Sequence, residues 1–465
     1  MVLRILALAG AALIGSAVHA RGVSPYLPLH QSPEIERQIE RLMILADQPI
    51  MTRPLAAATV FDALPKACER DPVLCEQVKR YLSGYMRTAG ISHASLTATA
   101  SSSETIALQN RRGMRSDSSY EISLSAYWQP SDHLLVNAGV HAYEGDTTPT
   151  GSIFSFGFEY AQLDIGYRDH WLSPLTDSAM AISTQAQTMP SLTVSNYTPL
   201  TRLGLRYQFF VAEMSESSNI GFQGGLTSGH PLLAGVHLSI EPFDGWSFGV
   251  SRVLQFGGGD RDRSLGSLFD ALFNPSDHDN GTVGDFGNQV ASFTSRFLVP
   301  GPFPLAVYFE YAGEDTSTLS NLRLGNSALS GGLHFPQLWQ SFDLTVEVSE
   351  WQNGWYVHGI YRDGLRHAGN VIGHWGGDQR TLNDGVGARS LMARLGWQPK
   401  FGGMLEATYR MLENEAYSGV DYARARALEL RYSRPWQQFL LGGELNAGED
   451  VFGNSYTRIS AFVRF

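Results

Sequence analysis

The last ten residues alternate between two kinds of side chain, and this pattern restricts the fold more than any other feature of the chain. One row of residues 456–465 includes Val463 and Phe465, whereas the other row carries Arg458 and Arg464. A period of two is typical of a β-strand whose two faces have different surroundings. The pattern predicts a strand that faces lipid or a core on one side and water on the other.

A final strand that ends on an aromatic residue is typical of the closing strand of bacterial outer-membrane barrels, in which Phe is the usual last residue. The alternative is the edge strand of a soluble β-sandwich that ends at Phe465. The rest of the sequence has to decide between these two folds.

The same alternation recurs from about residue 95 onward. Residues 342–349, 390–397 and 405–411 alternate between apolar side chains and polar or charged ones. Charged side chains inside a strand need water on that face, and the lumen of a barrel supplies it. These segments favour a barrel over a sandwich.

Two segments fit the pattern less well. Residues Ala423–Tyr432 change phase between Arg426 and Glu429, which predicts a β-bulge. Residues Ala186–Thr201 have no clear alternation, so they could contain a strand or an inward fold.

Connections between the expected strands alternate between short and long, which is the asymmetry of outer-membrane barrels. Counting the segments gives about eighteen strands, an even number that places both ends of the chain on the periplasmic side. The short connections lie at residues 129–132, around 161, and at 243–245, 300–302, 336–340, 398–403 and 434–437. The long connections include residues 168–177, 212–231, 257–288, 313–326, 352–387, 413–422 and 447–454.

Tryptophan placement supports this orientation. Five of the nine tryptophans flank the short turns, where the aromatic girdle of a barrel meets the edge of the membrane. These five are Trp128, Trp246, Trp339, Trp397 and Trp436. The other four, Trp171, Trp351, Trp355 and Trp375, lie at or in the long loops and remain open to a functional role.

Composition agrees with a transmembrane barrel. Only 17% of residues are charged, and the chain holds 48 glycines, 19 tyrosines and 24 phenylalanines. A formal net charge of −11 argues against nucleic-acid binding. The expected fold is therefore an all-β transmembrane barrel of about 18 antiparallel strands, preceded by a small N-terminal periplasmic α-helical bundle.

The first twenty residues have the pattern of an export signal. Arg4 gives the positive start, an apolar run follows, and Val18-His19-Ala20 is a small-residue cleavage site. We expect a signal peptide at residues 1–20, a periplasmic helical cap at 21–92 and an outer-membrane barrel at 93–465.

Three helices are expected in the cap. The first begins at Ser32-Pro33-Glu34, which combines a cap, a first-turn proline and an acidic first turn. The second begins at Thr52 and ends near Pro65, and the third begins at Asp71-Pro72 and ends at Gly90.

Both cysteines, Cys68 and Cys75, lie in this early segment. An even number of cysteines in an exported chain predicts a disulfide, here closing a small loop. Two free buried thiols are the alternative. The spacing does not match a metal site, because no histidine or third cysteine lies nearby.

The longest loop, residues 352–387, is the richest in side chains that can bind a ligand. Aromatic faces stack on sugar rings, carboxylates and amides bond hydroxyl groups, and arginine forks fit uronic acids or phosphates. The alternative is that these side chains pair with one another and fold the loop over the barrel mouth. The candidate polysaccharide-binding residues are Trp355, Tyr361, Arg362, Arg366, His374, Trp375, Asp378 and Arg380.

No motif predicts catalysis or a cofactor. The chain has no G-x-S-x-G elbow and no H-E-x-x-H helix, and the histidines of the long loop are too far apart for a zinc site. We therefore expect no enzyme activity, no metal and no cofactor.

Three segments are similar to the capsule-assembly Wzi family of outer-membrane proteins. They are Ser191–Arg202, Glu310–Asp315 and Val371–Arg380, and the last contains the run His-Trp-Gly-Gly-Asp-Gln-Arg, for which we find no general structural reason. The resemblance implies a barrel closed by the helical part at its periplasmic end and occluded by its outer loops. It also implies a lectin-like role on the surface of a Gram-negative cell, in which extracellular loops attach capsular or exopolysaccharide.

The expected partners are that polysaccharide, outer-membrane lipid and, during biogenesis, the barrel-assembly machinery. The rival hypothesis is a pore or export channel for polysaccharide or small solutes, which would conduct ions. A third, a soluble periplasmic sandwich, would wash out of membranes with salt.

Overall fold

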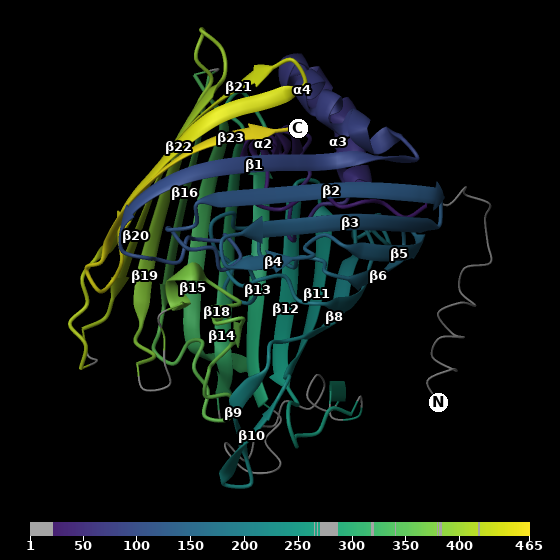
Figure 1. Cartoon of the computed structure of the whole chain (residues 1–465). Coiled ribbons are helices and arrows are strands. Elements are labelled where there is room, and N and C mark those ends of the chain that lie inside the picture. Colours follow the sequence, from purple (N-terminus) through teal and green to yellow (C-terminus); the bar gives the residue numbers. More distant parts are fainter. Residues whose placement is uncertain are drawn as a thin grey trace.

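The computed structural model describes residues 22–264, 266, 268–269, 287–317, 320–339, 341–378, 380, 384–416 and 419–465. Eighteen strands form one closed antiparallel barrel (Figure 1), because β1 pairs with β2 on one side and with β23 on the other. The short strand β4 (Asp146–Thr148) pairs with β3 ahead of β5 and adds no position to the ring. The prediction of about eighteen strands is confirmed.

The ring runs in chain order. Its strands are β1 (Ala89–Ser103), β2 (Tyr120–Ser131), β3 (Leu134–Tyr143), β5 (Ile153–Phe158), β6 (Ala161–Gly166), β7 (Ser191–Ser195), β8 (Arg206–Glu213), β11 (Leu232–Phe243), β12 (Trp246–Phe256), β13 (Gly287–Val299), β14 (Leu305–Ser317), β15 (Ser320–Leu338), β16 (Phe342–Trp351), β19 (Ala388–Trp397), β20 (Met404–Asn414), β21 (Ala425–Trp436), β22 (Phe439–Glu449) and β23 (Ser455–Arg464). Within the described residues, two hairpins lie outside the ring, β9–β10 (Ser217–Phe222, Gly225–Gly229) and β17–β18 (Arg366–His367, Asn370–Val371).

Side chains alternate across the barrel wall as the sequence predicts. In β16, Asp343 and Glu347 are buried toward the lumen, whereas Val348 is half exposed on the outer face. In β21, Glu429 and Arg431 point inward and Leu428 points outward. The wall is therefore apolar outside and polar inside, as a barrel in lipid requires.

The two ends of the barrel differ. The connections at one end are short, such as the residues between β2 and β3, and we call this the tight-turn end. Trp128, Trp246, Trp339 and Trp436 are exposed there, at the predicted girdle positions. The opposite end, which carries the β9–β10 hairpin in Figure 1, is the long-loop end.

Three α-helices lie at the tight-turn end, α2 (Pro33–Leu45), α3 (Ala57–Arg70) and α4 (Pro72–Leu82), followed by the 3₁₀ turn η1 (Ser83–Met86). They share a hydrophobic core with Tyr127 and Leu135 of the barrel wall. Asp71 caps α4, because its carboxylate accepts the Leu74 N–H at 3.0 Å. Among the described helices, none has the length and apolarity needed to cross a bilayer.

Helix α2 lies across the lumen and is tied to distant parts of the ring by ion pairs. Glu34 accepts two hydrogen bonds from Arg464 of β23, at 2.5 and 2.6 Å. Glu40 pairs with Arg296 of β13 and, at 2.9 Å, with Arg53. Helix α2 is therefore fixed inside the barrel by these contacts with the wall and is not a separate lid. We call α2 the stopper.

Three sequence predictions are wrong in detail. The second helix is α3, which begins at Ala57 and continues past Pro65 to Arg70. The third helix, α4, ends at Leu82 and not at Gly90, which lies in β1. The strand around Arg426 has no bulge, because its register with β20 and β22 is continuous; Arg426 points outward and is solvated near the strand end.

The disulfide between Cys68 and Cys75 is confirmed and joins α3 to α4. The proposed signal sequence, residues 1–20, lies outside the described residues. The poorly patterned stretch Ala186–Thr201 contains the short strand β7 and the end of an inward fold.

Candidate functional site

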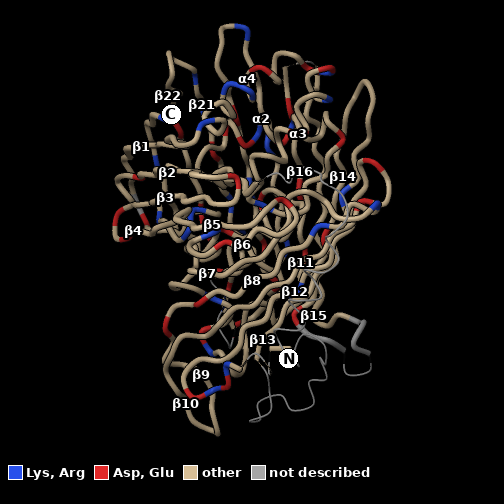
Figure 2. Tube along the Cα trace, turned by 90° about the vertical axis from the view of Figure 1, so that its right-hand side faces the viewer, with Lys and Arg blue, Asp and Glu red and all other residues tan. Residues whose placement is uncertain are grey.

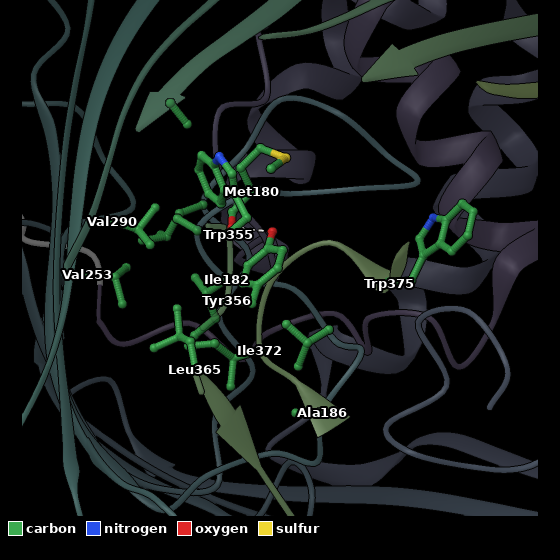
Figure 3. Close-up of a cluster of buried hydrophobic side chains, with 14 of the residues drawn as sticks. Met180, Ile182, Ala186, Val253, Val290, Trp355, Tyr356, Leu365, Ile372 and Trp375 are labelled. Carbon is green, nitrogen blue, oxygen red and sulfur yellow. Dashed lines mark hydrogen bonds between the residues drawn. The ribbon is translucent and has the colours of Figure 1, made fainter. Parts of the chain in front are cut away.

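Two segments of the chain fill the lumen between the helices and the long-loop end. We call residues 167–190, between β6 and β7, the inner segment, and residues 352–387, between β16 and β19, the plug loop. Both contribute to one hydrophobic core that also includes Val253 and Val290 of the barrel wall (Figure 3). The long loop therefore does not lie over the mouth of the barrel; most of it is packed inside.

Tyr356 links the two segments at the centre of this core. Its hydroxyl donates to the carbonyl of Met180 at 2.9 Å and accepts the N–H of His374 at 2.8 Å. Its own N–H is accepted by Glu314 of β14. A fully buried tyrosine with its polar atoms satisfied fixes the position of both segments.

The run from His374 to Gly377 forms a 3₁₀ turn whose glycines are required by packing. A Cβ on Gly377 would lie 2.3 Å from the Tyr356 ring, and one on Gly376 would lie 2.8 Å from Leu412. His374 caps the turn, because its Nδ1 accepts the Gly376 N–H at 2.9 Å. The structure thus gives the His-Trp-Gly-Gly motif a structural reason, which we did not find in the sequence alone.

Most charged candidates in the plug loop are paired within the protein. Arg366 donates to the carbonyls of Gly377 and Arg380 at 2.9 and 2.7 Å. Asp378 accepts the Val371 N–H at 2.7 Å and also accepts from Gln185 of the inner segment. These bonds fold the loop onto itself and tie it to the inner segment.

Burial shifts the pKa of two of these candidates. Burial, with a smaller contribution from Arg380, lowers the pKa of His374 to about 3. Burial raises the pKa of Asp378, although the Val371 N–H and Arg366 oppose that shift. The neutral imidazole of His374 accepts at Nδ1, so its Nε2–H donates to Ser390 at 3.0 Å.

A cavity of about 460 Å³ opens at the long-loop end. On one side it is lined by residues 215–217, which follow β8, and on the other by plug-loop residues. We call it the larger cavity. Five sequence candidates line it: Tyr361, Arg362, Arg366, Asp378 and Arg380.

The β9–β10 hairpin fixes the rim of the larger cavity. Asp363 accepts from Ser217 at 2.6 Å and from Asn219 at 2.8 Å, while Arg362 donates its backbone N–H to the Asn219 carbonyl at 3.1 Å. The Arg362 side chain is exposed and has no hydrogen bond or ion pair to any residue that the structure describes. Of the candidate arginines, it is the one whose guanidinium is directed to solvent.

A second cavity, of about 200 Å³, lies on the other side of the β17–β18 hairpin. We call it the smaller cavity. Its wall includes Gln109 and Arg115 from the loop between β1 and β2, together with Trp375, and strand residues of β20 to β23. Gly369 and Asp378 line both cavities.

Trp355 and His374 line neither cavity. Trp355 is 0% exposed, and its indole N–H donates to the Asn326 carbonyl at 2.6 Å. Contact between either side chain and a polysaccharide would require the plug loop to open, so that role stays a prediction. Figure 3 places Trp375 apart from Trp355 and Tyr356, and its indole N–H donates to Asp177 at 3.1 Å.

Sequence reasoning missed residues 215–217 and Gln109, which come from other loops. They are two serines, a glutamate and a glutamine that lie far from the aromatic-rich loop in the sequence, so only the fold brings them to the cavities. In the part of the chain that the structure describes, no group of three or more His, Cys, Asp or Glu side chains is arranged to hold a metal ion.

Comparison with known proteins identifies relatives at the level of family and fold. Residues 87–386 match the family model described as "Capsule assembly protein Wzi". A Klebsiella pneumoniae protein described as an uncharacterized 55.8 kDa protein in the cps region is 30% identical over 115 residues. That match spans 24% of this chain and only 21% of the relative.

Among solved structures, the Escherichia coli outer-membrane protein Wzi superposes with a TM-score of 0.72 at 15% identity, covering 95% of this chain and 99% of that one. That protein is described as involved in group 1 capsule assembly and as a carbohydrate-binding β-barrel. OccK5 (OpdH) of Pseudomonas aeruginosa gives a TM-score of 0.46 at 12% identity, covering 81% of this chain and 96% of that one. At these identities, the first match shows the barrel fold.

Proposed function

The chain belongs to the capsule assembly protein Wzi family, and we propose that it is an outer-membrane protein that binds capsular or exopolysaccharide and attaches it to the cell surface. The Escherichia coli protein with the same fold binds carbohydrate, which supports this proposal. The proposed role is binding without catalysis.

The orientation is part of the proposal. The long-loop end faces the outside, while the tight-turn end, with the helices of residues 21–92, faces the periplasm after removal of residues 1–20. Outer-membrane lipid covers the apolar wall of the barrel, residues 93–465, and the barrel-assembly machinery inserts it. The short connections at the tight-turn end support this orientation, because outer-membrane barrels have short periplasmic turns and longer extracellular loops.

The larger cavity is the observation that carries the proposal. It lies at the long-loop end, it is open, and its wall offers carboxylates, hydroxyls and the exposed guanidinium of Arg362. Polar groups of this kind on a preformed surface recognise sugar hydroxyls and acidic sugars. The packed plug loop beneath holds that surface rigid, which lowers the entropy cost of binding.

The packed lumen argues against the alternative function, a pore, and agrees better with a binding protein. The inner segment and the plug loop share a buried core, and α2 occupies the tight-turn end. A solute would have to displace these segments to pass through the barrel.

Replacing Arg362 with alanine tests the binding proposal. We expect the Arg362→Ala protein to fold normally and to bind surface polysaccharide, purified from the cells that carry this protein, about ten- to hundredfold more weakly, since a charge-assisted hydrogen bond contributes about 1.5–3 kcal/mol. Arg434→Ala removes an exposed arginine at the tight-turn end and serves as the matched control.

Binding would be measured on detergent-folded protein by surface plasmon resonance. If wild-type protein did not bind the polysaccharide, the proposed function would be wrong. Equal binding by both variants and wild type would exclude the larger cavity as the site.

A further inference from the structure

The two cavities lie on opposite sides of the same small hairpin. The larger one is walled by residues 215–217 and 361–366, and the smaller one by Gln109, Arg115 and the ends of β20 to β23. Among the residues that the structure describes, Gly369 and Asp378 are the two that line both. The β17–β18 turn therefore forms a low ridge between two hollows.

The ridge itself is free of bulky side chains. Its crest consists of Ala368 and Gly369, both exposed, and a Cβ built on Gly369 would meet no atom within 4 Å. The Ala368 N–H donates to Ser215 at 2.8 Å, and His367 accepts the Ser215 N–H at 2.8 Å, so the crest is fixed. This fixed crest of two small residues is a place where an extended chain could pass from one hollow to the other.

The smaller cavity has its own polar groups. Gln109 is partly exposed and has no hydrogen bond to any residue in the described ranges, and Arg115 uses one guanidinium nitrogen on the Thr105 carbonyl at 2.7 Å. Asn370 donates to the Ala368 carbonyl at 3.0 Å, which leaves its amide oxygen as an acceptor. These groups are of the type that binds sugar hydroxyls.

We propose that the smaller cavity is a second carbohydrate subsite, and that one polysaccharide chain occupies both cavities by crossing the Ala368–Gly369 ridge. This inference rests on the proposed function and adds to it the length of ligand that the protein recognises. A repeating polymer presents the same unit to both subsites, so the second contact is intramolecular. Such linkage strengthens binding by up to about 10²–10⁴-fold over a single subsite.

The test compares long polymer with short fragments of it. The probes are the purified surface polysaccharide and fragments of one or two repeat units from its partial hydrolysis. The variants are Gln109→Ala/Arg115→Ala in the smaller cavity and Ala368→Trp on the ridge, with Arg434→Ala/Gln438→Ala at the tight-turn end as the matched control.

We expect both test variants to bind long polymer at least about tenfold more weakly than wild type and the control. Binding of short fragments to Ala368→Trp is expected to stay within about twofold of wild type, because each subsite is intact. Folding of every variant is checked by its heat-dependent gel migration.

The outcomes separate this inference from the function on which it rests. Failure of wild-type protein to bind polymer overturns both. Normal polymer binding by wild type together with unchanged polymer binding by both test variants overturns the second subsite alone.

Discussion

Glu40 shows how single residues hold the stopper in the barrel. It lies on α2, and its carboxylate contacts Arg296 of the wall and Arg53 of the chain that follows the helix. Burial alone would raise the pKa of Glu40, but the charges of Arg296 and Arg53 lower it well below its ordinary value. The carboxylate is therefore ionised at all physiological pH values.

Replacement of Glu40 with alanine would leave two arginines without this partner in a buried site. We expect the helical segment to lose about 3–5 kcal/mol of docking stability, the usual cost of removing one member of a buried ion pair. Limited proteolysis of residues 22–88 would detect this loss as faster cleavage. Glu76→Ala removes an exposed ion pair with Lys79 on α4, and cleavage of that control should match wild type.

Gly377 tests the packing of the plug loop. The Gly377→Ala protein would place a Cβ 2.3 Å from the buried ring of Tyr356, and such overpacking costs about 1–3 kcal/mol. Gly359→Ala in the same loop is the control, because a Cβ there meets nothing within 4 Å.

Hydrogen exchange of residues 352–378 would measure the effect of both glycine substitutions. Faster exchange in the Gly377 variant than in the Gly359 variant is expected. Equal exchange would show that the turn does not depend on close packing against Tyr356.

His374 makes the plug loop sensitive to acid. Its folded pKa of about 3 lies below the unfolded value of about 6.5, so the unfolded loop binds the proton more tightly. The stability that the neutral imidazole contributes is complete above pH 6.5 and is lost as the pH falls toward 3. Between pH 6.5 and 4.5 the loss is about 2–3 kcal/mol.

The thermal midpoint of plug-loop opening, followed by tryptophan fluorescence, would test this at pH 7.5 and pH 4.5. Wild type should lose more stability on acidification than His374→Gln, which has no imidazole to protonate. An identical pH response in the two proteins would show that His374 does not control the loop.

At the scale of elements, the disulfide holds α3 against α4, and its effect on stability is local to these two helices. Its cysteines are 7 residues apart, and a loop of that size contributes about 2–3 kcal/mol in the chain-entropy model. We expect Cys68→Ser/Cys75→Ser protein to be cleaved faster by protease between residues 57 and 86, with normal heat-dependent gel migration of the barrel. Loss of the barrel in that variant would contradict a local role.

The elements that face two different environments could be predicted from the sequence. Strand β16 alternates between Val346 and Glu347 because one face meets lipid and the other the lumen, and the alternation is visible in the residues themselves. The start of α4 could also be predicted, because an Asp71 cap followed by a proline is a local signal for the beginning of a helix. Pro65 was misleading, since α3 continues through it.

The inward fold of the plug loop could not be predicted. Its aromatic and charged residues have the composition of a ligand-binding loop, but the same residues can also pair with one another. In the structure, Arg366 and Asp378 make hydrogen bonds within the loop. Which alternative holds depends on partners such as Met180 and Gln185, which come from a segment far away in the sequence. Local patterns do not contain that information.

At the scale of the whole molecule, the inner segment connects the two ends of the barrel. Near the helices, the Trp171 backbone pairs with that of Arg53 at 3.0 and 3.1 Å. Near the plug loop, Ser183 donates its N–H to Ile372 at 2.6 Å and its hydroxyl to Gly373 at 2.5 Å. Charged positions lie near the helices and near the β9–β10 hairpin in Figure 2, and others lie along the barrel between these two ends. The inner segment therefore joins the two ends through a filled interior.

The most direct test of this account is ion conductance through purified protein in a planar lipid bilayer. If the barrel is filled by its own chain, wild-type protein gives no steady current, whereas a variant in which a short turn replaces residues 352–387 conducts. A steady ohmic current through the wild-type protein would contradict the account.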